Sequence, residues 1–136
     1  MQEGIKSLPY KISYPKGKKT NILLSIPHCG TAFPEEIINH YNASKISQPD
    51  DTDWYLEQLY DFANELGITV IEAIYSRWVI DLNRTPQNKS LYDDGRIITS
   101  LCPVTDFKGE ALYTSIDHEP TQEEIQRRLQ TYYQPY

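Results

Sequence analysis

The amino-acid sequence predicts an α/β fold in which helices cover a parallel sheet. Two apolar runs of strand length, at residues 21–26 and 68–73, stand on either side of a helical pattern that extends from residue 51 to 67. A third apolar run follows at 78–82. Strand, helix and strand in this order indicate a βαβ unit, in which the two strands are parallel. We therefore expect strands over all three apolar runs.

The first expected strand, 21–26, ends in a sharp loop. Its apolar run stops at Pro27, and His28 and Gly30 follow directly. His28 is therefore expected at the carboxyl end of a strand. A short helix is expected to begin at Pro34, because proline suits the first helical turn and the two glutamates that follow it complement the helix dipole.

The helical pattern between the first two strands has one apolar face. Its members recur at spacings typical of a helix, and they are Tyr55, Leu59, Phe62, Ala63 and Leu66. Asp51 or Thr52 is expected to cap the start of this helix, and Gly67 is expected to end it. The residues from 85 to 120 are rich in Pro, Gly, Asn and Asp and are expected to form loops with short strands.

A last helix is expected near the end of the chain. Thr121 and Glu124 stand at the spacing of a capping box, and the helical pattern continues to Tyr133, shortly before Pro135. No internal repeat or linker interrupts the sequence, and a chain of 136 residues has the length of one ordinary domain. We therefore expect a single structural unit.

Composition excludes several classes of function. The formal net charge is −6, and the basic run 16–19 reads as a solvated turn, so a nucleic-acid-binding surface is not expected. No signal peptide or run of about 20 apolar residues is present, so we expect a cytoplasmic protein that does not enter a membrane. Cys29 and Cys102 are too few and too widely spaced for a disulfide framework, and reduced thiols are expected.

The first group of candidate functional residues comprises His28, Asp51 and Asp53. Ligands bind outside the carboxyl ends of the strands in open α/β sheets, which is where His28 is expected. Imidazole and carboxylate are ligands of catalytic zinc sites, which usually take three protein ligands and leave one position for water. From these residues alone a second interpretation stays open, namely a histidine hydrogen-bonded in a loop and two aspartates that cap a helix.

The second group surrounds the third expected strand. Arg77 and Arg84 flank the apolar run 78–82, and Asn83 precedes Arg84. A guanidinium binds a carboxylate through two parallel hydrogen bonds and an asparagine amide adds a donor, so Asn83 and Arg84 suit an anionic group of a substrate. The alternative, in which Arg84 pairs with a structural aspartate, stays equally open.

Three other residues of reactive type are assigned no chemistry. Cys29 adjoins His28, but neighbouring residues at a strand end point in opposite directions, so Cys29 is expected to be a small packed residue rather than a nucleophile. His40 and His118 lie in polar surroundings without a partner at ligand-like spacing, and they are expected at the surface.

These residues fall within stretches that resemble the N-formylglutamate amidohydrolase family of histidine degradation. The resemblance covers almost the whole chain in the order of the family, and its most specific part is Tyr75–Arg84, with the run Ser-Arg-Trp-Val-Ile-Asp-Leu-Asn-Arg. Cys29 departs from the serine or alanine that is commoner in the family. The other matching stretches are Ser25–Gly30, Asp51–Trp54, Leu91–Tyr92, Leu101–Pro103 and Ala111–Tyr113.

The resemblance implies zinc-dependent hydrolysis of the formyl amide of N-formyl-L-glutamate, or of a related small N-acyl acidic amino acid, to formate and glutamate. The family is similar to zinc carboxypeptidases, whose Asp-Leu-Asn-Arg element holds the carboxylate of the substrate. That similarity implies a three-layer α/β fold with a mostly parallel or mixed sheet flanked by helices.

The resemblance also implies roles for individual residues. His28 becomes a metal ligand, and either Asp51 or Asp53 becomes the acidic ligand. Because the substrate carries two carboxylates, its expected contacts are basic or amide side chains, namely Arg77, Asn83 and Arg84.

Members of the family continue beyond the point that corresponds to Tyr136. Their further part holds an Asp-Ala-His-Ser-like element with another metal-binding histidine, and acidic residues suited to general-base work. We therefore expect residues 1–136 to be the N-terminal portion of a single amidohydrolase domain, with an incomplete sheet. By itself this portion is expected to be inactive, to bind zinc weakly, and to associate with itself or another chain. A non-catalytic or truncated anion-binding domain is the alternative function.

Overall fold

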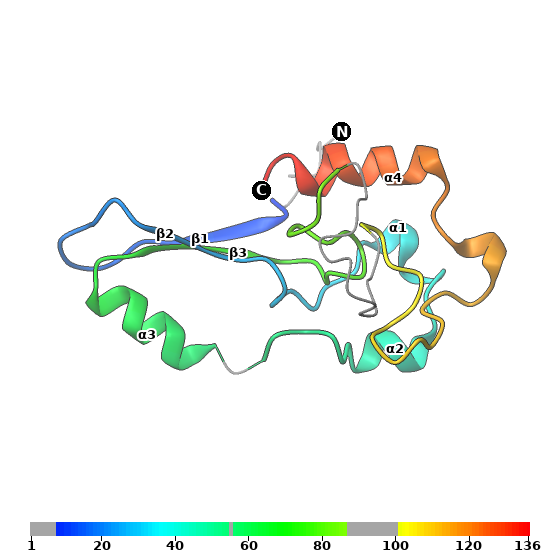
Figure 1. Cartoon of the computed structure of the whole chain (residues 1–136), viewed down its shortest axis with the longest axis horizontal. Coiled ribbons are helices and arrows are strands. Elements are labelled where there is room, and N and C mark those ends of the chain that lie inside the picture. Colours follow the sequence, from blue (N-terminus) through cyan, green and yellow to red (C-terminus); the bar gives the residue numbers. More distant parts are fainter. Residues whose placement is uncertain (1–7, 55, 87–100) are drawn as a thin grey trace, which may run out of the picture.

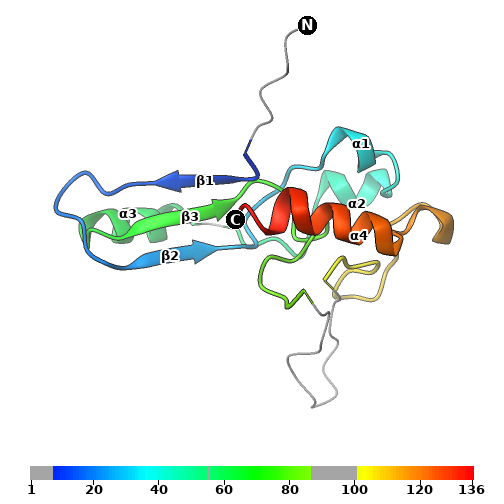
Figure 2. The same cartoon turned by 90° about the horizontal axis from the view of Figure 1, so that it is seen from above.

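The computed structural model describes residues 8–54, 56–86 and 101–136, and it contains a small mixed sheet flanked by helices (Figure 1). The strands lie in the spatial order β1, β3, β2, with bounds β1 (Tyr10–Ser13), β2 (Leu23–Ile26) and β3 (Thr69–Ala73). β2 runs parallel to β3, whereas β1 runs antiparallel to it. Figure 2 shows β1 and β2 at the two edges of the sheet. The α/β class expected from the sequence is confirmed.

The expected βαβ unit is present. β2 leads through helix α3 (Glu57–Glu65) to its parallel neighbour β3. α3 packs on one face of the sheet through Ala63, which is fully buried in a small cluster with Ile26 and Val70. Figure 1 shows α3 lying beneath the strands. Because β2 and β3 are parallel, their carboxyl ends lie at the same end of the sheet.

α3 is shorter than the sequence pattern indicates. The prediction that Asp51 or Thr52 caps it is wrong, because both residues are buried in a turn well before the helix starts. The carboxylate of Asp51 instead accepts a hydrogen bond from Trp78 Nε1 at 2.9 Å. The predicted end is confirmed, since Gly67 follows the helix with a left-handed φ of 72°. Tyr55, expected on the apolar face, lies outside the described residues.

The turn at Gly67 is expected to be sensitive to mutation. A Cβ at this position would lie 2.2 Å from the carbonyl oxygen of Lys18, in a backbone conformation that already disfavours a side chain. Gly67→Ala is therefore expected to lower the free energy of unfolding by about 2 kcal/mol. Gly17→Ala is the matched control, because a Cβ at Gly17 meets no atom within 4 Å. Urea denaturation that found the two variants equally stable would contradict the described turn.

The prediction of a third strand at residues 78–82 is wrong. The backbone turns here, with Val79 N donating to Ser76 O at 2.9 Å. The run is apolar because Trp78, Val79 and Ile80 are buried in the main core. Burial in a core and burial in a sheet produce the same apolar pattern over a run this short.

Two elements are not anticipated by the sequence pattern, β1 and the short helix α2 (Ala43–Ser47). The helix α1 (Glu35–Ile38) follows Pro34 as predicted. The described part of the expected loop region is mainly irregular and ends in the short helical turn η1 (Ile116–His118). Residues 87–100, with the matching stretch at 91 and 92, lie outside the described residues.

The last helix begins as predicted. α4 (Gln122–Arg128) follows Thr121, whose hydroxyl accepts a hydrogen bond from Glu124 N at 3.2 Å. It continues as a wider π-helical turn, η2 (Leu129–Tyr133). The carboxylate of Glu124 binds the two arginines of the last turn of α4, so it does not complete the capping box. In the described parts of the chain, no helix is both long and apolar enough to cross a membrane.

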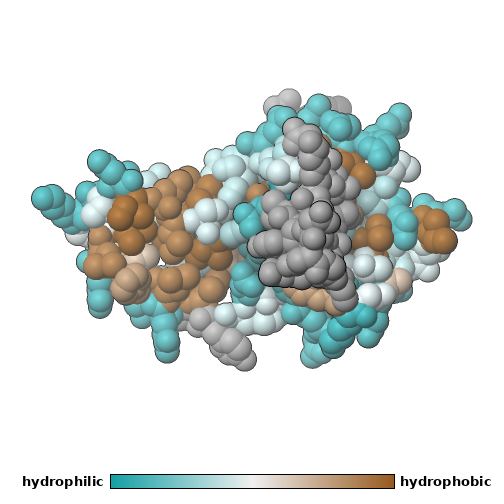
Figure 3. All heavy atoms as spheres, viewed as in Figure 1, coloured by the Kyte–Doolittle hydropathy of each residue, from teal (hydrophilic) through white to brown (hydrophobic). Residues whose placement is uncertain are grey.

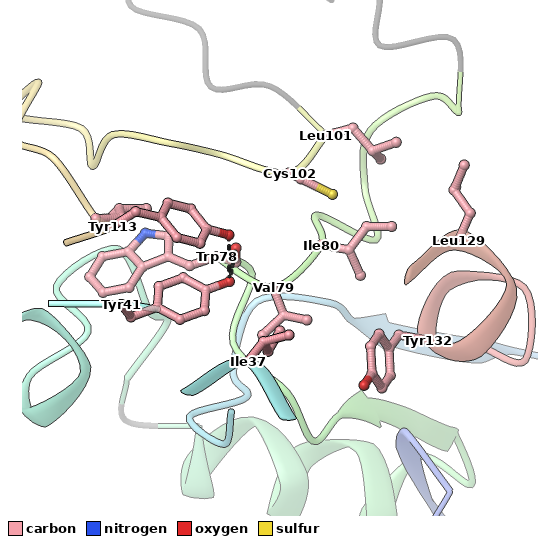
Figure 4. Packing of buried hydrophobic residues seen from close by; sticks show 11 residues of the cluster. Ile37, Tyr41, Trp78, Val79, Ile80, Leu101, Cys102, Tyr113, Leu129 and Tyr132 are labelled. Carbon is pink, nitrogen blue, oxygen red and sulfur yellow. Dashed lines mark hydrogen bonds between the residues drawn. The ribbon is translucent and has the colours of Figure 1, made fainter. Parts of the chain in front are cut away.

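The main core lies between α1, α4 with η2, and the turn that follows β3. Figure 4 shows Tyr41, Trp78 and Tyr113 grouped on one side of it, with Leu129 and Tyr132 reaching it from the last helix. Its buried members are Ile37, Tyr41, Trp78, Val79, Ile80, Leu101, Cys102, Leu112, Tyr113, Leu129 and Tyr132.

A buried arginine joins the parts of this core. Arg128 is 1% exposed, and its Nη1 donates to Tyr113 Oη at 2.8 Å and to Val79 O at 3.0 Å. The hydroxyl of Tyr113 donates to that of Tyr41 at 2.8 Å, and Tyr41 donates to Trp78 O at 3.0 Å. This network therefore fixes the backbone just before the residues of the candidate site.

A second buried charge, Asp106, predicts a dependence of stability on pH. Lys45 Nζ donates to Asp106 Oδ2 at 2.7 Å, and the backbone N–H groups of Lys108 and Glu110 donate to Oδ1. Burial raises the pKa of this carboxyl, but these donors outweigh burial and bring the pKa below its usual value. Ionised Asp106 therefore stabilises the fold above the pKa of the unfolded chain, and this stabilisation is lost as the pH falls through the lower folded pKa.

Asp106→Asn is therefore expected to lose stability at neutral pH and to approach the wild type below about pH 4. Urea denaturation of both proteins between pH 7 and pH 3 measures the difference. If the difference in the free energy of unfolding between the two proteins stayed constant over this pH range, the charge of Asp106 would not contribute to stability.

Candidate active site

The loops that follow β2 and β3 meet at the carboxyl ends of these strands. His28 lies two residues beyond the end of β2, as predicted, and residues 77–84 lie in the segment after β3. The backbone N–H of Asp53 donates to His28 O at 2.9 Å, which joins the segment before α3 to the same place. All of the predicted site residues therefore come from three segments gathered at one end of the sheet.

A buried carboxylate, Asp81, lies at the centre of this group. Its Oδ1 is 2.6 Å from His28 Nε2 and accepts from Asn83 N at 2.9 Å. Its Oδ2 accepts from Arg77 Nη2 at 2.9 Å and lies 3.7 Å from Arg84 Nε. Asp81 is 0% exposed, so these contacts are shielded from water.

The surroundings of Asp81 favour its ionised form. Burial raises the pKa of this carboxyl, but the hydrogen bond and charge of His28 and the charge of Arg77 outweigh burial and lower it. An ionised carboxylate only accepts hydrogen bonds, so His28 donates through Nε2. In the neutral imidazole, this hydrogen bond selects the tautomer whose Nδ1 keeps its lone pair, which is the form that binds a metal ion.

The guanidinium of Arg77 is engaged within the protein at one edge and on one face. Besides its hydrogen bond to Asp81, it lies under the ring of Phe107, 4.8 Å from the centroid. It is buried, and its closest charge is that of Asp81. The structure thus places Arg77 in the site as a support for Asp81, and Phe107 is a neighbour that the sequence does not reveal.

Asp51 and Asp53 differ in their surroundings. Asp51 is buried, and its carboxylate accepts hydrogen bonds from Trp78 Nε1 at 2.9 Å and Phe107 N at 3.2 Å. Burial raises the pKa of Asp51 in spite of these donors. Asp53 is exposed and is joined to His28 through the backbone. Asp53 is therefore the more accessible of the two carboxylates.

Asn83 and Arg84 lie on the outer side of Asp81. Asn83 is exposed, whereas the side chain of Arg84 is mostly buried and its backbone carbonyl accepts from Tyr133 Oη at 2.7 Å. The ion pair between Arg84 and Asp81 matches the alternative from the sequence, in which Arg84 pairs with a structural aspartate. Arg84 directly follows the exposed Asn83 in the chain, and the role of the two residues in holding a substrate stays a prediction.

The sequence pattern around Asp81 predicts that this residue is buried, but it indicates neither metal binding nor substrate binding. A single acidic residue stands inside an apolar run, with arginines four residues before it and three residues after it. Such an aspartate is expected to be buried and paired with a basic residue. Its contact with His28 joins residues 53 positions apart in the sequence, and no local pattern indicates it.

The remaining reactive residues lie apart from Asp81. Burial, followed by the charge of Glu72, raises the pKa of the half-buried Cys29 thiol, which disfavours the nucleophilic thiolate. His40 and His118 are exposed, and their rings stack at a centroid distance of 4.9 Å.

A pocket of about 420 Å³ opens beside Asp53, between the end of β3 and the start of α3. Its lining includes Cys29, Asp53, Trp54 and Glu72. Among the described residues, no three His, Cys, Asp or Glu side chains lie close enough together to hold a metal ion. Asp53 thus faces an open space, whereas His28 is not part of the pocket lining.

Comparison with known proteins shows the family of the chain. The sequence profile of the N-formylglutamate amidohydrolase family matches residues 20–136. A curated relative from Pseudomonas putida, named N-formylglutamate deformylase, is 40% identical over 125 residues, which are 92% of this chain and 45% of that protein. A relative of the same name from Pseudomonas aeruginosa is 38% identical over 128 residues, again with 92% and 45% covered.

A solved structure has a similar fold. The crystal structure of an N-formylglutamate amidohydrolase from Ralstonia eutropha superposes with a TM-score of 0.69 at 21% identity, over 96% of this chain and 48% of that one. The chain thus spans about half the length of these relatives. The family profile covers most of the chain, which therefore belongs to the N-formylglutamate amidohydrolase family.

Proposed function

We propose that the protein carrying this chain hydrolyses the formyl amide of N-formyl-L-glutamate to formate and glutamate. The names of its relatives support this substrate. The structural observation that carries the proposal is the buried Asp81, which gathers His28, Arg77 and Arg84 at the carboxyl ends of β2 and β3. The site therefore combines a candidate metal ligand with cationic groups for an acidic substrate.

We further propose that the enzyme depends on zinc, because the donors present suit this metal. A histidine that binds a metal usually donates its other ring N–H to a carboxylate, as His28 does to Asp81. We assign the acidic ligand to Asp53, since the carboxylate of Asp51 is occupied by Trp78 and Phe107. When bound, zinc would polarise the formyl oxygen and lower the pKa of a water molecule.

Two ligands from this chain are fewer than the three that catalytic zinc sites usually take from the protein. We propose that the third ligand and the general base come from the half of the family fold that this chain does not span. We also propose the three-layer arrangement of zinc carboxypeptidases for the complete fold. The cytoplasmic location and the role in histidine degradation stay predictions from the sequence.

Asn83 and Arg84 are assigned to a carboxylate of the substrate. The exposed amide of Asn83 and the guanidinium of Arg84 are both donors that suit a carboxylate. Arg77 is assigned as the second cationic group, and it acts through its positive charge because Asp81 and Phe107 hold its guanidinium. Holding the substrate in this way orients the formyl carbon for attack by water.

Formate release from N-formyl-L-glutamate tests the proposal. The intact protein that carries this chain, loaded with zinc, is expected to release one formate for each glutamate formed, and treatment with a chelator is expected to abolish the activity. Related N-acyl-glutamates define the acyl group that the enzyme accepts. Binding of N-formylglutamate without formate release would contradict hydrolysis and favour the non-catalytic anion-binding domain.

Asp81→Asn is expected to lower kcat/KM and the affinity for zinc together, by roughly 10- to 100-fold, because an amide cannot supply the charge that orients His28. Asp117→Asn is the control, since Asp117 is exposed on η1. Enzyme assays and zinc titration of both variants in the intact protein provide the measurement. A fall in kcat/KM with unchanged zinc affinity would place the role of Asp81 elsewhere.

A further inference from the structure

An exposed aromatic side chain, Phe107, lies against the candidate site. Its ring covers one face of the guanidinium of Arg77, with 4.8 Å between Arg77 Cζ and the ring centroid. Phe107 is 44% exposed, although phenylalanine is among the residues most often buried in a core. Packing in the core therefore does not account for the position of this ring.

Phe107 also lies apart from the apolar area over α3. Figure 3 shows brown spheres gathered on the left of the molecule, over α3 and the adjoining sheet. The yellow segment that follows residue 101 and includes Phe107 lies to the right of the strands in the same view (Figure 1). The exposure of Phe107 is therefore a separate feature, located at the candidate site.

The backbone of Phe107 is held by a buried carboxylate. Its N–H donates to Asp51 Oδ2 at 3.2 Å, and the same oxygen accepts from Trp78 Nε1 at 2.9 Å. Asp51 and Trp78 are both buried, so water competes little for these hydrogen bonds. The residue before Phe107 is Asp106, which Lys45 holds from the other side. The ring thus extends from a fixed point of the backbone.

Arg77 is the residue through which Phe107 reaches the site. Nη2 of Arg77 donates to Asp81 Oδ2 at 2.9 Å, and Nη1 donates to Asp51 O at 3.5 Å. An arginine side chain turns about several bonds, and a ring on the face of its planar guanidinium restricts the tilt of that plane. The electron-rich face of the ring also attracts the positive charge. Asp51 and Phe107 together therefore limit the orientations of Arg77.

We propose that Phe107 is a positioning residue for substrate binding, which fixes the guanidinium of Arg77 and is itself held by Asp51. The inference rests on the proposed function, in which Arg77 is the second cationic group for an N-acyl acidic amino acid. A guanidinium fixed in advance loses less conformational freedom when the substrate binds. This advantage is the same in the ground state and the transition state, so it changes KM and leaves kcat unaltered.

Steady-state kinetics of the intact protein with N-formyl-L-glutamate test the proposal. Phe107→Leu keeps an apolar side chain but removes the ring, and it is expected to raise KM about fivefold with kcat nearly unchanged. Phe107→Tyr retains the ring and is expected to keep the wild-type KM. Phe62→Leu is the matched control, since Phe62 is 55% exposed on α3, outside the site.

A double-mutant cycle shows whether Phe107 acts through Arg77. In an Arg77→Gln protein the ring has no guanidinium to hold, so Phe107→Leu is expected to cause no further rise in KM. Three results would overturn the proposal: a wild-type KM in Phe107→Leu, an equally raised KM in Phe107→Tyr, or the same rise in KM with and without Arg77. The first two results decide the matter even if Arg77→Gln does not fold.

Failure of the proposed function gives a different result. If the intact protein binds N-formyl-L-glutamate but releases no formate, hydrolysis is contradicted and calorimetry of this ligand replaces kinetics. Phe107→Leu is then expected to raise the dissociation constant by the same factor, and Phe107→Tyr to leave it unchanged. Formate release with a KM that Phe107→Leu does not alter would count against the positioning role alone. An intact protein that does not bind N-formyl-L-glutamate would overturn both proposals.

Discussion

Replacing Arg128 by leucine is expected to lower the free energy of unfolding by about 3–5 kcal/mol, the largest effect on stability anticipated for a single residue. Nη1 of Arg128 donates to Val79 O and to the hydroxyls of Tyr113 and Tyr41 inside the main core. Leucine fills part of the space but donates no hydrogen bond. The carbonyl of Val79 then remains buried without this donor, at a cost of about 1–3 kcal/mol by itself.

Arg127→Leu is the matched control for this experiment. Arg127 is the neighbouring residue, 37% exposed, and it forms ion pairs with Glu124 and Glu36 at the surface. Such pairs contribute about 1 kcal/mol or less, so this variant is expected to unfold near the wild-type urea concentration. If the two variants were equally stable, Arg128 would not hold the core together.

Arg84→Ala is expected to lower kcat/KM of the intact protein by roughly two to three decades, which corresponds to about 2–4 kcal/mol of transition-state stabilisation. The loss follows from the removal of a charged hydrogen-bond donor from the carboxylate of the substrate. Arg84→Lys is expected to recover only part of the rate, because an ammonium group does not reproduce the planar, two-pronged contact of a guanidinium.

The same variant separates the two interpretations of Arg84. The residue lies 3.7 Å from Asp81, so a purely structural role predicts a loss of stability with little change in kinetics. A role in substrate binding predicts the reverse, with a fall in kcat/KM and a nearly unchanged urea midpoint. Wild-type kinetics in a destabilised Arg84→Ala protein would therefore assign Arg84 to Asp81 alone.

The part of the fold that the sequence predicts correctly is the part with local signals. β2, α3 and β3 follow one another with clear periodicity, and Gly67 ends the helix in a left-handed conformation that favours glycine. Thr121 likewise marks the start of α4, because its hydroxyl binds the backbone N–H of Glu124, three residues later in the sequence. Each of these features depends on residues that are close in the sequence.

The incorrect predictions concern features that depend on distant residues. Asp51 has the pattern of a helix cap, but its partners are 27 and 56 residues away, in Trp78 and Phe107. β1 is four residues long and is a strand because it pairs with β3, some 60 positions along the chain. Local propensity contains little information about pairings at such separations.

The candidate site combines features that local sequence predicts with contacts between residues distant in the sequence. The position of His28 at the end of β2 could be predicted from the sequence, whereas the contacts of Asp81 with His28 and Arg84 depend on the fold. The apolar run around Asp81 supports two structures equally well, a strand and a buried turn. The resemblance to a family indicates the residues involved, and the geometry shows how they contact one another.

The imidazole nitrogen signals of His28 test most directly whether the buried Asp81 prepares this histidine for a metal ion. In ¹⁵N NMR spectra of the 136-residue chain, assigned with a His28→Gln variant, Nε2 is expected to carry the proton and Nδ1 to remain unprotonated. Zinc added at millimolar concentration is expected to shift Nδ1, and Asp81→Asn to abolish the preference for this tautomer. A proton on Nδ1, or signals of His28 that zinc leaves unchanged, would contradict a metal site built on His28 and Asp81.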